Sequence, residues 1–448
     1  MATQSKKEAI ILFLGDIFFL YLSLFVMLFI SYLEFPSEKL LSQHLSAFSI
    51  LFIAWIMVFF IAGLYEKHTI FFKNRLPNII LNAQVVNTLL AVLFFYFIPY
   101  FGITPKTNLF IYLIISFGLM LLWRIYGHSV LGNKKREPAL IINSEEESLE
   151  LLEEVNNNSR YSFYFASVIG KNKSSKELSV EILREVREKN ISYIIVNLKS
   201  ERIKSILPDL YELIYEGVEF IDKYGVYEDI FDRVPVSLLG YDWFLENLSV
   251  APKFSYDFLK RLMDIIISLP LLLISLIFYP FVIFFIKIED GKEIFIKQER
   301  VGKDNKGVTI FKFRSMSGLD QGEEVLKSRH IVTKVGAFLR KTRIDELPQL
   351  WNVLRGDISL IGPRPEIPTL VKEYSDRIPY YNVRHLIKPG LSGWAQIYHD
   401  NHPHHGTDIK ETKNKLSYDL YYIKNRSFFL DLKITLRTIK SLLSKSGI

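Results

Sequence analysis

Two adjacent carboxylates, Asp345 and Glu346, stand in an arginine-rich stretch that leads to a Gly-Pro-Arg-Pro turn at residues 362–365. A carboxylate surrounded by guanidinium groups is expected to have a depressed pKa and to stay ionised, which suits nucleophilic attack or metal binding better than general-acid work. Arg364, between two prolines that fix the local backbone, would present a planar fork of N–H groups to phosphate. These residues predict a phosphate site with a carboxylate at its centre and phosphoryl transfer as its chemistry.

The same residues also allow a plainer interpretation. An amphipathic helix with a charged face often carries an Asp-Glu pair whose carboxylates form ordinary salt bridges with basic residues three or four positions away. The pair alone therefore does not distinguish an active site from a solvated helix face.

A series of ordered segments lies between about residues 257 and 445. The segments are Lys260–Asp264, Gln298–Gly302, Phe311–Met316, Asp345–Asp357, Gly362–Pro365, Lys388–Gln396 and Tyr418–Ile423. Together they resemble the motifs of the bacterial sugar transferase family, the monotopic phosphoglycosyl transferases that begin glycan assembly on a polyprenyl phosphate carrier. The amino-terminal half resembles the large form of that family, which has a four-span bundle and a Rossmann-like insert.

The resemblance implies a two-step reaction. Asp345 would attack the β-phosphate of a UDP-sugar, release UMP and hold the sugar phosphate, and undecaprenyl phosphate would then attack that intermediate. Such ping-pong chemistry lets one carboxylate serve a soluble and a lipidic substrate in turn. Glu346 is implied to help hold Mg²⁺, a hard ion that binds carboxylate and phosphate oxygens.

The resemblance also implies the substrate-binding residues. Arg364, Arg314 and Arg340 match family positions near the diphosphate, where their charges would stabilise the transition state. Lys312, which alternates with Arg314 on a predicted strand, and Pro363 are assigned to the same substrate site. The alternative for each basic residue is a contact with the protein surface or with lipid headgroups.

Composition independently indicates a membrane protein with several domains. The chain has 448 residues and 49% hydrophobic residues, with a mean hydropathy of +0.18, which is too apolar for an average soluble protein. A net charge of +7 suits an anionic lipid surface or an anionic substrate. The basic residues are not gathered on one stripe, so nucleic acid is not expected as a partner. The absence of cysteine excludes disulfides and thiolate catalysis.

Residues 1–130 are expected to form a transmembrane four-helix bundle. Four apolar stretches, near residues 9–32, 45–64, 79–101 and 107–126, are long enough to cross a hydrocarbon core of about 30 Å. Lysine and arginine concentrate before the first stretch, between the second and third, and after the fourth, which places both ends of the bundle in the cytoplasm. Asp16 within the first stretch is either a functional site or a structural residue that forms an interhelical hydrogen bond or lies at a shallow depth.

Residues 131–250 are expected to form a small cytoplasmic Rossmann-like α/β domain. Apolar runs at 139–142, 163–169 and 193–198 alternate with helical patterns at 145–155, 177–189 and 201–215. A dinucleotide site would need a glycine-rich turn after the first run, but three glutamates, residues 145–147, stand there. We therefore expect this domain to serve dimerisation or regulation, with a homodimer as the oligomer.

Residues 251–448 are expected to form the catalytic domain, which begins with an apolar helix at about 257–287. Lys260 and Arg261 precede its apolar run, further lysines follow it, and Pro270 and Pro280 interrupt it. Charge on both flanks and proline inside predict a re-entrant helix that enters and leaves the same leaflet, while an ordinary fifth span is the alternative. Asp264 belongs to the same helix, and the family's usual Ser-Pro bend is replaced here by Tyr279-Pro280 or an earlier position.

Three further features near the carboxy terminus also predict a role. The glycine-punctuated loop Lys388–Gln396 could approach a nucleotide closely. The cluster His399–His405 fits a mobile lid better than a metal site, and Leu430–Leu443 is an amphipathic helix suited to an anionic membrane surface.

The sequence thus predicts a membrane protein of the α plus α/β class. A bundle and a Rossmann-like domain precede a re-entrant helix that carries a mostly helical catalytic domain on the cytoplasmic face of the bacterial inner membrane. The competing interpretation is an inactive membrane scaffold or regulator of glycan assembly. The residues that would select the sugar are not identifiable from the sequence.

Overall fold

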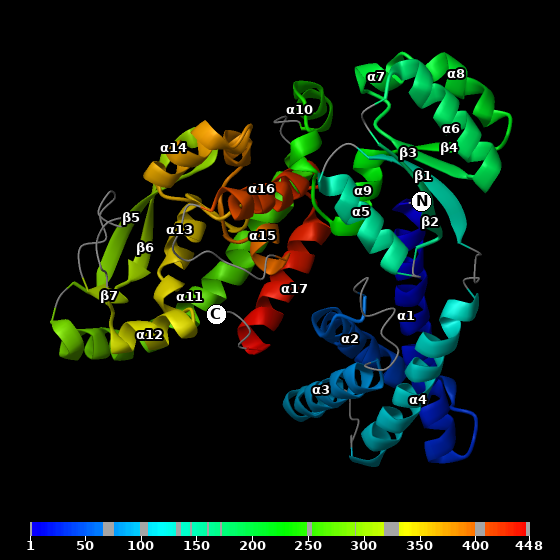
Figure 1. Ribbon diagram of the computed structural model, residues 1–448. Helices are drawn as coiled ribbons and strands as arrows, with labels where there is room; N and C mark the ends of the chain where they lie inside the picture. The colour runs from blue at the N-terminus through cyan, green and yellow to red at the C-terminus, as the bar shows by residue number, and fades with distance from the viewer. Residues whose placement is uncertain are drawn as a thin grey trace. The chain divides into compact units, whose positions relative to one another are not determined.

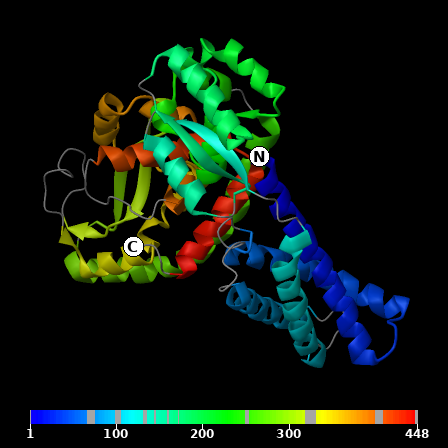
Figure 2. The same ribbon diagram turned by 45° about the vertical axis from the view of Figure 1, so that its right-hand side comes forward.

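The computed structural model describes residues 2–65, 76–98, 106–130, 136–143, 146–158, 161–170, 173–248, 253–291, 293–317, 331–398 and 408–444. The chain divides into two compact units, residues 1–226 and residues 227–448. Figure 1 labels their elements, and Figure 2 shows the same ribbon turned by 45°.

The first unit begins with four long apolar helices, which confirms the predicted helices of the bundle. All four are long and apolar enough to cross a membrane. Their shared core is aromatic: the rings of Phe48, Trp55 and Tyr112 pack with centroids 5.2–6.1 Å apart. The helices are α1 (Ala2–Tyr32), α2 (Glu38–Ala62), α3 (Leu76–Phe97) and α4 (Lys106–Val130).

Asp16 of α1 forms a buried ion pair with Arg124 of α4. The Arg124 Nε donates to Asp16 Oδ1 at 3.1 Å, and its Nη2 makes a second bond to Asp16 Oδ2. The Arg124 Nη1 donates to the Leu64 carbonyl oxygen at 2.8 Å. Asp16 is fully buried and Arg124 is 6% exposed. The interhelical hydrogen bond, one of the alternatives for Asp16, is the contact that the structure contains.

The rest of the first unit is a parallel four-stranded sheet with the order β2-β1-β3-β4. The first three strands were predicted, whereas β4 was missed because its four residues, Glu219–Asp222, begin and end with a charged residue. The predicted helix at 201–215 is instead three short helices, and Pro208 stands within the second of them. The elements are β1 (Glu137–Asn143), α5 (Glu146–Asn157), β2 (Phe163–Gly170), α6 (Ser175–Lys189), β3 (Tyr193–Val196), α7 (Glu201–Lys204), α8 (Leu207–Tyr211), η2 (Glu212–Ile214) and β4. Helix α9 (Lys223–Phe231) begins in this unit and ends in the second unit, which starts at residue 227.

The second unit is mostly helical with small two-stranded sheets, as predicted for the catalytic domain. The antiparallel pair β5–β6 and the parallel pair β9–β10 are the two sheets used by the site. The elements are α10 (Tyr241–Asn247), α11 (Phe254–Asp290), β5 (Phe295–Val301), β6 (Gly307–Phe313), β7 (Met316–Ser317), β8 (Ile331–Val332), α12 (Lys334–Lys341), η6 (Ile344–Glu346), α13 (Gln349–Arg355), β9 (Ser359–Ile361), α14 (Pro368–Arg377), η7 (Tyr381–Leu386), β10 (Gly390–Ser392), α15 (Trp394–Tyr398), α16 (Ile409–Lys424) and α17 (Phe428–Ser444).

Helix α11 is a fifth helix long and apolar enough to cross a membrane. It extends over 37 residues and remains helical through Pro270 and Pro280. Along α11, a row of buried side chains recurs at intervals of three, four or seven residues. Many apolar side chains on its other faces are exposed. A single stripe of this period marks one helix face packed on protein. The buried stripe is Asp264, Ser268, Leu272, Ser275, Val282 and Ile286.

The Asp16–Arg124 pair yields a test of the bundle. Asp16→Leu leaves the Arg124 guanidinium buried without a counter-charge, so we expect a loss of about 3–5 kcal/mol in the free energy of unfolding. Thermal unfolding in detergent measures the loss. Replacing both residues by leucine is expected to recover most of it, and a single variant that melts like the wild type would contradict a stabilising pair.

Candidate active site

Asp345 and Glu346 lie in η6, the short turn between α12 and α13. Helix α12 ends at Lys341, and Arg343 then takes a left-handed conformation with φ of +58°, which a non-glycine residue rarely adopts. This turn redirects the chain so that Asp345 is buried at 8% exposure. Helix α12 packs closely against the segment after β6. A Cβ on Gly336 would lie only 1.9 Å from the Ser315 carbonyl oxygen, so this approach requires glycine. The backbone therefore fixes where the two carboxylates lie.

The Glu346 carboxylate is surrounded by three cations. Its Oε1 accepts a hydrogen bond from Arg364 Nη2 at 2.7 Å and lies 3.7 Å from Lys312 Nζ and 3.8 Å from Arg343 Nη1. Burial would raise the pKa of Glu346, but the charges of Arg364, Lys312 and Arg343 together hold that pKa well below its usual value. Glu346 is therefore ionised and neutralised by its neighbours.

The pKa of Asp345 is shifted in the opposite direction, upward. Burial raises its pKa, and the charge of Glu346 raises it further; Lys312, Arg340 and Arg343 lower it, and the result is a pKa of about 6. The prediction of a depressed pKa is therefore wrong for Asp345 and confirmed for Glu346. The physical reason is that the cations lie around Glu346, while Asp345 loses water and gains a like-charged neighbour. Above neutral pH Asp345 is still mostly ionised.

Lys312 reaches the site from strand β6, which α13 holds in place. Asn352 of α13 donates from Nδ2 to the Thr309 carbonyl oxygen at 2.8 Å and accepts from the Phe311 backbone N–H at 3.1 Å. These bonds fix the strand on both sides of residue 310, two positions before Lys312. Burial lowers the pKa of Lys312, and the charges of Arg364 and Arg300 lower it further.

Arg364 is positioned by close contacts between two backbone segments. A Cβ on Gly390 would lie 2.1 Å from the Gly362 nitrogen, so only glycine fits there. The Gly390 N–H also donates to the Pro363 carbonyl oxygen at 3.0 Å. The glycines of the loop Lys388–Gln396, predicted to approach a nucleotide, thus approach the Gly-Pro-Arg-Pro turn in this structure. Pro363 is buried within that turn.

The remaining predicted arginines differ in their placement. Arg340, in the last turn of α12, contributes to the electrostatics of Asp345. Arg314 is buried, and its Nε donates to the Met316 carbonyl oxygen at 3.2 Å. Its role toward a diphosphate stays a prediction. Arg343 was not predicted as a site residue, although its spacing of three positions from Glu346 was a usable signal.

The donor set fits a divalent cation that arrives with its substrate. Mg²⁺ is commonly bound by one or two carboxylates together with substrate phosphates and water. Asp345 and Glu346 could supply the carboxylates, and no group of three His, Cys, Asp or Glu that could hold a metal occurs among the described residues. The described residues therefore offer two carboxylates toward Mg²⁺, and the binding of that ion stays a prediction.

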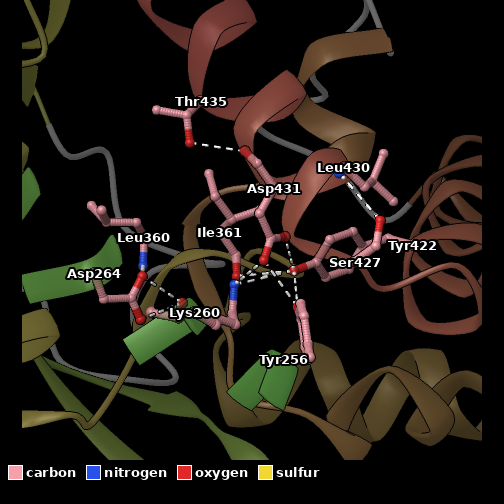
Figure 3. Close-up of polar contacts among 11 residues, drawn as sticks. Tyr256, Lys260, Asp264, Leu360, Ile361, Tyr422, Ser427, Leu430, Asp431 and Thr435 are labelled. Atoms are coloured by element: carbon pink, nitrogen blue, oxygen red, sulfur yellow. Dashed lines mark hydrogen bonds and ion pairs between the residues drawn. The ribbon is translucent and has the colours of Figure 1, made fainter. Parts of the chain in front are cut away.

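The first half of α11 is anchored to the catalytic unit by its polar residues (Figure 3). Lys260 Nζ lies 3.0 Å from Asp431 Oδ2, and Arg261 donates to the carbonyl oxygens of residues 353 and 354 at the end of α13 at 2.7 and 2.6 Å. Asp264 accepts bonds from the Ser359 hydroxyl at 2.8 Å and from the Leu360 N–H at 3.0 Å. These three residues, predicted for the membrane helix, therefore hold α11 to α17, to α13 and to β9 respectively, and β9 is the strand that leads into the Gly-Pro-Arg-Pro turn.

Two other predictions concern the carboxy-terminal part. The cluster His399–His405 lies outside the described residues. Two cations of the amphipathic α17 lie over aromatic rings of their own unit: Lys433 Nζ is 5.0 Å from the Trp394 ring centroid, and the Arg437 guanidinium is 4.4 Å from that of Tyr398. Their use at a membrane surface stays a prediction.

Comparison with known proteins identifies relatives of this second unit. The model of the family described as bacterial sugar transferase matches residues 255–445. An uncharacterised sugar transferase, EpsL, of Bacillus subtilis is 39% identical over 191 residues, which are 42% of this chain and 90% of the relative.

Two further relatives have names that state an activity. A UDP-N-acetylgalactosamine-undecaprenyl-phosphate N-acetylgalactosaminephosphotransferase of Aeromonas hydrophila is 42% identical over 208 residues, which are 44% of this chain and 47% of the relative. A UDP-glucose:undecaprenyl-phosphate glucose-1-phosphate transferase of Caulobacter vibrioides is 38% identical over 200 residues, which are 43% of this chain and 73% of the relative. The match thus spans about half of the Aeromonas protein.

The raised pKa of Asp345 predicts a specific effect on stability. The folded state binds the Asp345 proton more tightly than the unfolded state does, so the free energy of unfolding falls as the pH rises from about 4 to about 6. Asp345→Asn removes that loss, which corresponds to at most about 3 kcal/mol. We expect the variant to melt above the wild type at pH 7.5 but not at pH 4. Equal melting temperatures at both pH values would contradict the raised pKa.

Proposed function

Because the chain belongs to the bacterial sugar transferase family, we propose that it transfers a sugar 1-phosphate from a UDP-sugar to undecaprenyl phosphate and releases UMP. This would be the first membrane step of polysaccharide or glycoconjugate synthesis. Two relatives that match this unit carry names of that reaction type. The observation that carries the proposal is a buried aspartate, Asp345, next to a glutamate that three cations neutralise.

In the proposed first step, an ionised Asp345 oxygen attacks the β-phosphorus of the UDP-sugar. A bond forms between that oxygen and phosphorus, the bond from phosphorus to the bridging oxygen breaks, and UMP leaves with the electron pair. In the second step a phosphate oxygen of undecaprenyl phosphate attacks the same phosphorus and returns the carboxylate of Asp345. Two sequential displacements let the same carboxylate serve both substrates.

The cations would act on the charge that develops at the phosphorus. Arg364 and Lys312 are already fixed at the site, so they would stabilise that charge without reorganisation. Glu346 would hold Mg²⁺ together with phosphate oxygens, and the ion would supply further neutralisation of the diphosphate. The raised pKa makes Asp345 a more basic, and so more nucleophilic, carboxylate than an exposed aspartate once it is ionised.

We also propose that α11 is re-entrant, with the catalytic unit on the cytoplasmic face of the inner membrane. Lys260 near its start bonds to Asp431 of α17, while Glu289 near its end accepts bonds from the N–H groups of residues 334 and 335 of α12. A straight helix between those two positions would be about 44 Å long, which exceeds a hydrocarbon core of about 30 Å. Both ends nevertheless contact the same compact unit, which argues against an ordinary fifth span.

The direct test is UMP release by the purified protein in nanodiscs with Mg²⁺, undecaprenyl phosphate and a panel of UDP-sugars. Release that requires a particular sugar and the lipid phosphate would support the reaction and identify the donor. No release with any donor, from a correctly folded protein, would support the inactive scaffold instead.

Two variants separate the roles of the site residues. Asp345→Asn is expected to lower kcat by at least about 1,000-fold, because the amide cannot form the bond to phosphorus. Arg364→Lys keeps the charge but loses the two-pronged fork, so we expect a loss of about 100-fold in kcat. UMP release at the wild-type rate by Asp345→Asn would exclude Asp345 as the nucleophile.

The pKa of Asp345 also predicts the pH dependence of turnover. If ionised Asp345 is the nucleophile, kcat/KM for the UDP-sugar rises with pH up to about pH 6 and levels off above it. A pH–rate profile from pH 5 to 8 measures this limb. A profile that falls through the same range would indicate that the protonated carboxyl is the active form.

A further inference from the structure

Arg384 is a buried arginine that contacts the backbone of Arg364. It lies in η7 and is 5% exposed. Its Nη2 donates to the Arg364 carbonyl oxygen at 3.0 Å, and its Nη1 donates to the Tyr381 hydroxyl at 2.6 Å. The planar guanidinium thus joins the Gly-Pro-Arg-Pro turn to the loop that carries η7.

Asp419 of α16 completes this arrangement. Its Oδ2 lies 2.8 Å from Arg384 Nη2, and Asp419 is 1% exposed. A buried ion pair is weak evidence for stability, because the desolvation of two charges offsets most of their attraction. Stability alone therefore does not account for the Arg384–Asp419 pair. The contact of Arg384 with the Arg364 carbonyl oxygen indicates a second role.

We propose that Arg384 and Asp419 are positioning residues that aim the Arg364 guanidinium at Glu346 and at the donor diphosphate. The inference rests on the proposed function and deepens it. Asp419 orients Arg384, and Arg384 fixes the Arg364 carbonyl. The Arg364 side chain is 38% exposed and is held at its far end by Glu346. Its direction therefore depends on the backbone from which it starts.

A small error in that direction is expected to be costly. A displacement of about 1 Å in a group that stabilises a transition state can reduce the rate about 100-fold. The prolines on either side of Arg364 restrict rotation about their own N–Cα bonds, but they do not fix the turn in space. The Gly390 N–H holds the turn at the Pro363 carbonyl oxygen, and Arg384 holds it at the next carbonyl oxygen, that of Arg364.

Helix α16 also supplies a matched control. Lys424, five positions after Asp419, pairs with Glu228 at 2.8 Å and lies 5.4 Å from the Trp243 ring centroid. This second pair connects α16 to the start of the unit instead of to the Gly-Pro-Arg-Pro turn. Glu228→Gln therefore disturbs an ion pair of α16 without a direct effect on Arg364.

The test compares Arg384→Lys with Glu228→Gln in the UMP-release assay. Lysine keeps a positive charge beside Asp419, but a single ammonium cannot hold the Arg364 carbonyl, the Tyr381 hydroxyl and the carboxylate in one plane. We expect Arg384→Lys to lower kcat about 10- to 100-fold while KM for the UDP-sugar changes less than about threefold. Glu228→Gln is expected to lower the melting temperature and to keep kcat near the wild-type value.

The outcomes distinguish a failure of the positioning role from a failure of the proposed function. An active wild type with an Arg384→Lys variant of unchanged kcat overturns the positioning role and leaves the proposed function intact. Equal losses of kcat in Arg384→Lys and Glu228→Gln, at similar losses of melting temperature, also overturn it, because a general loss of stability would then explain both. A folded wild type that releases no UMP overturns the proposed function and, with it, the positioning role.

Discussion

The site depends on how charge is divided between two neighbouring carboxylates. Glu346 receives Arg364, Lys312 and Arg343 and is held ionised. Asp345 is left buried beside that negative charge, and its pKa rises to about 6. Two buried carboxylates without cations could not both ionise near neutral pH. The ion pair between Glu346 and Arg364 neutralises part of that charge and so permits both carboxylates to be ionised near neutral pH.

The scaffold brings these groups together from distant parts of the sequence. The left-handed turn at Arg343 places the carboxylates, Asn352 holds the strand of Lys312, and close contacts between glycines position the turn of Arg364. The apolar helix α11 takes part as well, because Asp264 bonds to β9 immediately before that turn.

Local patterns in the sequence predicted the apolar helices, three of the four strands in the parallel sheet of the first unit, and the residues around Asp345 and Glu346. Such patterns report periodicity, charge and chemical type, which are properties of neighbouring residues. They could not show that burial outweighs the arginines at Asp345, because burial depends on the folded structure. For the same reason Arg384 was not noticed, since its contact with the Arg364 carbonyl joins positions 20 residues apart. The anchoring roles of Lys260, Arg261 and Asp264 likewise appeared only in the fold.

The central claim is that Asp345 forms a covalent bond to the sugar phosphate, and trapping that adduct tests it most directly. The protein in nanodiscs would be incubated with its UDP-sugar and Mg²⁺ in the absence of undecaprenyl phosphate, digested, and analysed by mass spectrometry. The account predicts a sugar-phosphate mass on the peptide that contains Asp345, and its loss when the lipid phosphate is added. An unmodified Asp345 peptide under conditions in which both substrates together give full turnover would contradict it and indicate direct transfer between the two substrates.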